Sequence, residues 1–278
     1  MSENFVLLIE CDDQIGLVYQ ISKVIFNHNL NIKSNSEFVD EESKKFFMRT
    51  VVSGGLDQEV FLDELRAVLP KDALIRFSKQ AKKNIIILAT KESHVLGDLL
   101  IKNYENELDA NILAVVSNHN LLKSLVEKFD IPYHHCDVGE LNRQDHEYEL
   151  SQIIELYNPD IIVLAKYMRV LTPWFVCKYD GKILNIHHSF LPAFIGANPY
   201  KQAHQRGVKI IGATAHLVTN DLDEGPIISQ DIVRVDHSFS WQDMKKAGRN
   251  VEKVVLSNAL DLLLEDRVFV HNNKTVIL

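Results

Sequence analysis

The feature that most constrains this chain is a continuously apolar run, Asn84–Ala89, followed by a regular alternation of helical and extended patterns. A strand that is apolar on both faces is typical of a parallel sheet covered by helices on both sides. Helices are expected to alternate with further strands, the helices over residues 93–106, 121–129 and 147–157 and the strands over 110–116 and 160–165. This order predicts an α/β domain with a doubly wound, mostly parallel sheet.

The sheet is expected to continue into a stretch where one strand ends in polar side chains. An apolar run from Lys182 leads into Asn185, Ile186 and His187. Because side chains alternate along a strand, Asn185 and His187 point to one face while Ile186 points to the core. Polar side chains at strand ends lie where open α/β sheets bind ligands. The elements expected to follow are a loop, a short helix (198–206), a strand (209–218), an acidic turn (220–226), a long helix (241–265) and a hairpin (269–277).

The first eighty residues carry a different pattern, which predicts a separate domain. Strands are expected over residues 5–10, 31–39, 45–52 and 74–77, and helices over 17–25 and 56–69. The resulting βαββαβ order is the ferredoxin-like split arrangement. A basic linker at residues 78–83 separates the two patterns, so we expect one domain over residues 1–80 and a second over residues 84–278.

Charge and cysteine usage argue against several classes of protein. The 30 basic and 38 acidic residues give a net charge of −8, whereas a general nucleic-acid binder carries a basic surplus. No apolar run approaches the roughly 20 residues that a membrane helix needs. Cys11, Cys136 and Cys177 lie far apart and form no CxxC, which favours buried thiols in a reducing compartment. We therefore expect a cytoplasmic protein with no nucleic-acid or membrane partner.

The turn after the first strand of the predicted sheet, residues 90–97, restricts the substrate. Rossmann folds and P-loops need closely spaced glycines there so that a phosphate can approach the backbone. This turn holds Glu92 and His94 with Gly97 as its single glycine, and no GxGxxG or Walker sequence occurs elsewhere. The pattern argues against NAD and ATP and predicts a second substrate without phosphate.

Three motifs within fifty residues are characteristic of one family. They are Asn185-x-His187, then Ser189-Phe190-Leu191-Pro192, and then His216 followed seven residues later by Asp223. In this order they resemble the folate-dependent formyltransferase family. The resemblance implies that Asn185, His187 and Asp223 are the catalytic residues.

The chemistry of formyl transfer suits these three residues. The amide of Asn185 can donate to the oxyanion that develops on the formyl oxygen, an interaction usually worth roughly 3 kcal/mol. The imidazole of His187 belongs to the side-chain type that titrates near neutrality and can move a proton. Asp223 can pair with His187 and serve as a base toward the nucleophile. With no phosphorylated second substrate, water is the simplest nucleophile.

Nearly the whole chain is similar to family members that hydrolyse 10-formyltetrahydrofolate to tetrahydrofolate and formate. The further segments that carry this resemblance are residues 46–50, 164–171, 223–228 and 247–249. It implies an enzyme without metal or cofactor, whose formate can serve purine biosynthesis. It also implies a folate pocket lined by Met168, Arg169, Val170, Leu171, Val218, Thr219 and Asp221, with His216 and Ser189 behind the catalytic residues. One departure is Asn198, where the family pattern has an arginine.

The N-terminal pattern resembles an ACT domain, on the strength of the Asp13-x-x-Gly16-Leu17 turn and the entry to the second strand at residues 28–32. The resemblance implies pairing of sheets edge to edge, so we expect a homo-oligomer, a dimer of dimers or higher. It also implies an amino-acid effector, glycine or methionine, at Asp13, Gly16, Leu17, Asn31 and Ile32. A purely structural oligomerisation module remains an equal alternative.

Other readings of the same residues stay open at this point. A metal-dependent hydrolase would use His187, His188, His216 and Asp223, although no HExxH-like helical pair is present. A formyltransferase to an unphosphorylated amine would use the same catalytic residues. A sensor would bind folate or an amino acid without turnover. His188 is expected to face away from His187, as a packing residue or one behind the catalytic residues, and residues 134–135 are interpreted as strand surface. His216 suits a core histidine and a partner of Asp223 equally well.

Overall fold

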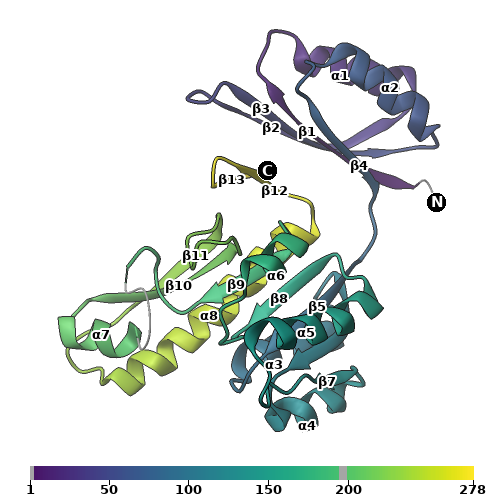
Figure 1. Ribbon diagram of the computed structural model, residues 1–278. Coiled ribbons are helices and arrows are strands. Elements are labelled where there is room, and N and C mark those ends of the chain that lie inside the picture. Colours follow the sequence, from purple (N-terminus) through teal and green to yellow (C-terminus); the bar gives the residue numbers. More distant parts are fainter. Residues whose placement is uncertain (1–2, 194–198) are drawn as a thin grey trace. The chain divides into compact units, whose positions relative to one another are not determined.

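The computed structural model describes residues 3–193 and 199–278, which form two compact units (Figure 1). The first unit comprises the chain up to Ala81 with Asp266–His271 and Val276–Leu278, and the second comprises Lys82–Glu265 with Asn272–Thr275. The sequence analysis instead assigned the whole C-terminal segment to the second domain. None of the described helices is long and apolar enough to cross a membrane.

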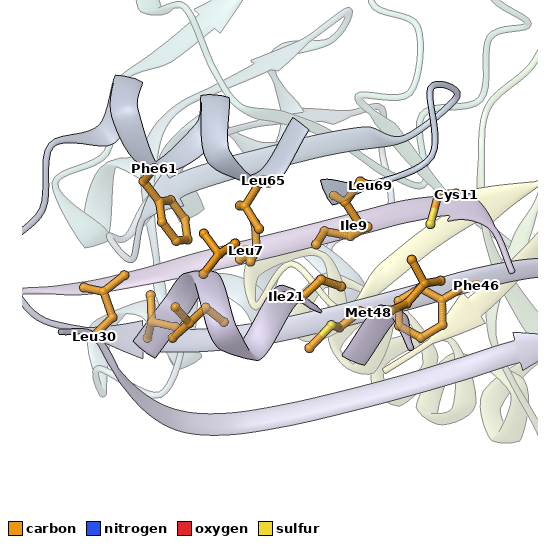
Figure 2. Packing of buried hydrophobic residues seen from close by; sticks show 14 residues of the cluster. Leu7, Ile9, Cys11, Ile21, Leu30, Phe46, Met48, Phe61, Leu65 and Leu69 are labelled. Atoms are coloured by element: carbon orange, nitrogen blue, oxygen red, sulfur yellow. The ribbon is translucent and has the colours of Figure 1, made fainter. Parts of the chain in front are cut away.

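The first unit is an antiparallel sheet with two helices, in the predicted βαββαβ order. Its elements are β1 (Asn4–Asp12), α1 (Leu17–Asn27), β2 (Asn31–Asp40), β3 (Lys45–Ser53), α2 (Gln58–Val68) and β4 (Leu74–Lys79). The strands lie in the order β2-β3-β1-β4. Figure 2 shows the core between sheet and helices, where Leu7 and Ile9 of β1 face Ile21 of α1 and Phe61 and Leu65 of α2.

The C-terminal strand β12 (Val268–His271) packs within the first unit because one face of the sheet carries apolar side chains that need cover. Side chains of β1 and β3 alternate, so Leu8 and Phe47 point away from α1 and α2. The ring of Phe269 meets that of Phe47 edge to face, with centroids 5.5 Å apart. This packing explains why residues 266–271 group with the N-terminal unit.

The second unit is built on a seven-stranded sheet in the order β11-β10-β9-β8-β5-β6-β7. Its strands are β5 (Lys83–Ala89), β6 (Ala110–Ser117), β7 (Tyr133–His135), β8 (Ile161–Ala165), β9 (Ile183–His187), β10 (Ile210–Leu217) and β11 (Ile227–Arg234). The five strands from β9 to β7 are parallel, and β10 and β11 are antiparallel to their neighbours. The expectation of a mostly parallel, doubly wound sheet is therefore confirmed.

The helices of this unit are α3 (His94–Tyr104), α4 (Lys123–Val126), α5 (Arg143–Tyr157), α6 (Pro173–Lys178), α7 (Pro199–Arg206) and α8 (Trp241–Leu264). The helix expected over residues 121–129 is instead a single α turn, α4, between two 3-10 turns, none of which has a side-chain cap. Strand β11 and helix α6 were not predicted. The chain closes with β13 (Lys274–Ile277), which pairs with β12.

The sheet reverses its strand order between β5 and β8, and this reversal positions the site. From β5 the chain proceeds outward through β6 and β7, whereas β8, β9 and β10 extend the sheet on the other side. Ligands of open α/β sheets bind beyond the carboxyl ends of the strands at such a switch point. The carboxyl ends of β8 and β9 are followed by Lys166 and His188, which line a cavity.

The cysteines only partly follow their expected placement. Cys11 and Cys136 are buried free thiols, but Cys177 is exposed. The expectation of three buried thiols is wrong for Cys177 because the short helix α6 turns only Phe175 and Val176 into the core.

Candidate active site

Asn185, His187 and Asp223 line a single cavity of about 740 Å³ within the second unit. Asn185 and His187 come from the end of β9, and both side chains emerge on the same face, as strand alternation requires. Asp223 comes from the connection between β10 and β11. Because β10 runs antiparallel to β9, this connection lies beside the carboxyl end of β9. Three residues separated in sequence therefore meet in one place.

An acidic loop holds Asp223 in a strained but well-defined conformation. The backbone N–H of Leu217 donates to the carbonyl of Pro226 across 3.0 Å, which closes the loop. Asp223 itself has a φ of +58°, a left-handed conformation that aspartate tolerates better than most residues. At Gly225 an added Cβ would lie 1.8 Å from the carbonyl oxygen of Leu217, so this position accepts only glycine.

The carboxylate of Asp223 is paired with two imidazoles. Its Oδ1 lies 3.2 Å from Nδ1 of His187 and 3.7 Å from Nε2 of His216. Burial alone would raise the pKa of Asp223, but the hydrogen bond from His187, with His216 close by, outweighs it and holds that pKa far below its usual range. Asp223 is therefore ionised at neutral pH and fixes the Nδ1 side of His187.

The other ring nitrogen of His187, Nε2, is available to a ligand. Nε2 of His187 is buried and has no hydrogen-bond partner among the described residues. Buried polar atoms are almost always paired in native proteins, so an unpaired one marks a position that a ligand can satisfy. With Nδ1 turned to Asp223, Nε2 is the atom that faces a substrate in the cavity.

His216 fixes the orientation of Asn185. Nδ1 of His216 donates to the carbonyl oxygen of Leu217 at 2.9 Å, which turns Nε2 of the ring towards Asn185. The amide Nδ2 of Asn185 donates to this Nε2 at 3.1 Å. One amide hydrogen of Asn185 is thereby used, and the second remains for an oxygen in the cavity. Of the two sequence interpretations of His216, the structure favours contact with the site residues.

The residues implied by the family resemblance to line a folate pocket gather on the same cavity. Those that follow β8 are Met168, Arg169, Val170 and Leu171, and those that follow β10 are Val218, Thr219 and Asp221. The apolar side chains of Met168 and Val170 are 60% and 46% exposed, which leaves them available to cover a flat ring system. Ser189 is buried. Its backbone carbonyl accepts a hydrogen bond from the hydroxyl of Thr214 at 2.9 Å, whereas its own hydroxyl has no partner among the described residues.

Comparisons with known proteins identify the family of this chain. Residues 83–260 match the formyl transferase family model and residues 5–70 the ACT domain model. The formyltetrahydrofolate deformylase of Haemophilus influenzae is 52% identical over 278 residues, covering 100% of both chains. That of Escherichia coli K12 is 52% identical over 273 residues, covering 98% of each. The chain belongs to the formyltetrahydrofolate deformylase family.

Solved structures lead to the same family. The crystal structure of a formyltetrahydrofolate deformylase from Pseudomonas syringae matches with a TM-score of 0.94 and 42% identity, covering 100% of this chain and 95% of that one. Glycinamide ribonucleotide transformylase 1 from Symbiobacterium toebii matches with a TM-score of 0.68 and 28% identity, covering 71% of this chain and 94% of that one. The deformylases thus match over both units, and the transformylase over a smaller part.

The expectation that His188 faces away from His187 is wrong. His188 lines the cavity, and its ring lies 5.2 Å from that of His187. The prediction failed because β9 ends at His187, so strand alternation no longer applies to the next residue. Burial, together with the charge of Lys166, lowers the pKa of His188 to about 4. It is therefore a neutral imidazole at neutral pH.

The sequence analysis missed a second group of polar residues on the same cavity, among them Lys166, Tyr200 and Glu252. Glu252 could have been noticed, because it lies on the apolar stripe of α8 with Met244, Gly248 and Leu256 at helical spacing. A charged residue in that stripe indicates a buried ion pair. Lys166 and Tyr200 carry no comparable signal.

The remaining predicted positions lie elsewhere. Asp13, Gly16, Asn31 and Ile32 are exposed in the first unit, whereas Leu17 is 2% exposed and belongs to the core, so its side chain is not open to an effector. Asn198 lies outside the described residues.

Nε2 of His134 forms a hydrogen bond with the hydroxyl of Tyr157 at 2.7 Å, and His135 is exposed, as expected of strand surface. Within residues 3–193 and 199–278, no group of three or more His, Cys, Asp or Glu side chains is arranged to hold a metal ion.

Proposed function

We propose that this chain hydrolyses 10-formyltetrahydrofolate to tetrahydrofolate and formate, with Asn185, His187 and Asp223 as its catalytic residues. The observation that carries the proposal is the pairing of His187 with Asp223 beside Asn185, which leaves Nε2 of His187 open to the cavity. The names of the close relatives point to the same reaction. The folate would lie along the segments at 168–171 and 218–221.

Each catalytic residue has one task in this reaction. Nε2 of His187 takes a proton from water as the water oxygen bonds to the formyl carbon. The free amide hydrogen of Asn185 donates to the oxyanion of the tetrahedral intermediate, and His216 holds the amide in place. His187 then gives the proton to N10 as the carbon–nitrogen bond breaks, which releases tetrahydrofolate and formate.

Asp223 acts through His187 in this account. The sequence suggested that Asp223 serves as the base toward the nucleophile. Its strongly lowered pKa makes it a weak base, and its contact with Nδ1 suits a carboxylate that orients the ring and stabilises the imidazolium. A positioned carboxylate of this kind keeps the catalytic nitrogen in the tautomer that can accept a proton.

The reaction is tested by measuring the products of the purified protein. With 10-formyltetrahydrofolate, a chelator and no amine, we expect equal amounts of formate and tetrahydrofolate. The chelator tests the proposal that no metal takes part, because inhibition by the chelator that added metal reverses would contradict it. Tight binding of the folate without formate would contradict hydrolysis and leave a transferase or a sensor.

We extend the proposal to the setting and partners of the enzyme. The chain would act in the cytoplasm, where its formate can enter purine synthesis. Strand β2, an edge strand of the first unit whose residues 31–38 are all exposed, would pair with a second copy in a homo-oligomer, a dimer of dimers or higher. Glycine or methionine would bind this unit as effector. If neither amino acid at millimolar concentration changes the rate or the melting temperature, the effector proposal fails.

A further inference from the structure

One side of the cavity, lined by Lys166, Tyr200 and Glu252, carries a closed network that also includes His94 of α3, and we call it the Glu252 cluster. Its members are Glu252, His94, Lys166 and Tyr200. The carboxylate of Glu252 accepts hydrogen bonds from Nε2 of His94 at 2.8 Å and from the hydroxyl of Tyr200 at 2.6 Å. Nζ of Lys166 lies 3.3 Å from the same carboxylate.

The cluster is fixed in place. Glu252 is 1% exposed and Lys166 is 6% exposed, and both oxygens of Glu252 have partners. Burial alone would raise the pKa of Glu252, but His94, Lys166 and Tyr200 lower it to about 2. Lys166 has a φ of +60°, a conformation that an ordinary residue keeps only where its surroundings hold it there.

Helix α8 is shaped to receive Tyr200. A Cβ placed on Gly248 would lie 2.2 to 2.5 Å from the hydroxyl and ring atoms of Tyr200. The tyrosine therefore rests directly on the helix backbone. Glycine inside a helix lowers its stability, and the close approach of Tyr200 explains why glycine stands here. The ring of Tyr200 lies 6.0 Å from that of His188, which lies 5.2 Å from the ring of His187. Tyr200 and His188 thus fill the space between Glu252 and the catalytic imidazole.

The charges beside the cluster are also mutually satisfied. Glu92, on the turn before α3, lies 3.0 Å from Nζ of Lys245 and 3.2 Å from a guanidinium nitrogen of Arg249. Burial would raise the pKa of Glu92, but these cations and Lys166 hold it below its usual value. Lys166, Lys245 and Arg249 are therefore engaged with Glu92 and Glu252, so a phosphate or carboxylate that binds these three cations would have to displace a carboxylate of the protein itself.

An amine acceptor needs this side of the cavity. The segments at 168–171 and 218–221 form the other side, which the proposed function assigns to the folate. We propose that the Glu252 cluster, Tyr200 and His188 form an acceptor-side wall that admits water to the formyl carbon and excludes amines. This inference rests on the proposed function and adds the residues that choose the nucleophile.

The two competing reactions differ only in the attacking atom. When water attacks, its oxygen bonds to the formyl carbon, the bond to N10 breaks, N10 takes one proton of the water, and formate leaves. When a primary amine attacks, its nitrogen bonds to the carbon, N10 takes one proton of the amine, and an N-formyl amine leaves. The ratio of N-formyl amine to formate therefore measures directly how well the wall excludes amines.

The test is to open the wall with Tyr200→Ala and to offer hydroxylamine or glycinamide together with 10-formyltetrahydrofolate. We expect the original chain to yield formate. Tyr200→Ala should raise the ratio of N-formyl amine to formate by about tenfold or more, the change in selectivity that filling or emptying a pocket commonly produces. The matched control is Tyr200→Phe, which keeps the ring and should keep the original ratio. His188→Ala opens the same wall if Tyr200→Ala does not fold.

Each outcome decides. An unchanged product ratio in a folded Tyr200→Ala or His188→Ala that still releases tetrahydrofolate overturns the wall. Loss of tetrahydrofolate release in both variants also overturns it, because a wall is dispensable for the chemistry. If the original chain releases no formate, the proposed function fails instead, and if it formylates the amines as readily as it makes formate, the wall alone fails.

Discussion

The two sides of the cavity each hold a carboxylate, Asp223 half-buried and Glu252 buried, and the two are used in opposite ways. Asp223 contacts the imidazoles of His187 and His216, and Nε2 of His187 has no partner among the described residues. Glu252 has both oxygens engaged by His94, Lys166 and Tyr200. The comparison teaches that a reactive side keeps one polar atom open, whereas a closed network forms a wall.

The largest effect is expected from Asp223→Asn. The change removes the charge that holds Nδ1–H of His187, so kcat should fall about a thousandfold, the middle of the range for a general acid–base residue and its partner. The matched control is Asp221→Asn in the same loop, which should change KM more than kcat. Steady-state kinetics and calorimetric binding of tetrahydrofolate check the prediction, and near-normal kcat in Asp223→Asn would remove Asp223 from the mechanism.

The next two variants change one glycine on each side of the cavity, Gly225 beside Asp223 and Gly248 beside Tyr200. In Gly225→Ala the new Cβ meets the backbone oxygen of Leu217 at 1.8 Å, so the loop that carries Asp223 must move. A displacement of about 1 Å in a catalytic group can cost about a hundredfold in rate, and we expect kcat to fall by that order. Activity within a factor of three of the original chain would show that Asp223 tolerates displacement.

Gly248→Ala should act on the wall instead. Here the new Cβ meets the ring of Tyr200, so the tyrosine leaves Glu252 and the second unit loses about 2 kcal/mol by overpacking. Hydrolysis should persist while the N-formyl amine fraction rises. Gly97→Ala in α3 is the control, because a Cβ there meets nothing within 4 Å and alanine suits a helix better. Equal behaviour of the two variants would contradict the role of Tyr200.

The smallest effect is a pH dependence caused by His188. Its pKa in the folded chain is about 4 against a usual value of 6.5, so the unfolded state binds the proton more readily and stability falls as pH drops from 6.5 towards 4. Between pH 7 and 5.5 this costs roughly 1 kcal/mol. His188→Asn should lack that loss. Urea unfolding followed by tryptophan fluorescence measures it within the second unit, which holds both tryptophans, Trp174 and Trp241. Parallel pH profiles of the two proteins would contradict it.

The sequence predicted that Asn185 and His187 lie on one face and missed the Glu252 cluster, for a physical reason. Asn185 and His187 share one strand, so alternation places them on one face. Asp223 was found only through its motif, because no local pattern shows where a loop returns. The Glu252 cluster draws one residue from each of four separate segments, and nothing local joins them. Likewise, the apolar face around Phe47 gave no sign that Phe269 would cover it.

The central claim is that water is the nucleophile at His187. The most direct measurement is hydrolysis of 10-formyltetrahydrofolate by the purified chain in ¹⁸O-labelled water, with mass analysis of the product. We predict formate that carries one labelled oxygen per molecule, released together with an equal amount of tetrahydrofolate. Formate without the label, or a formylated amine in place of formate, would contradict the account.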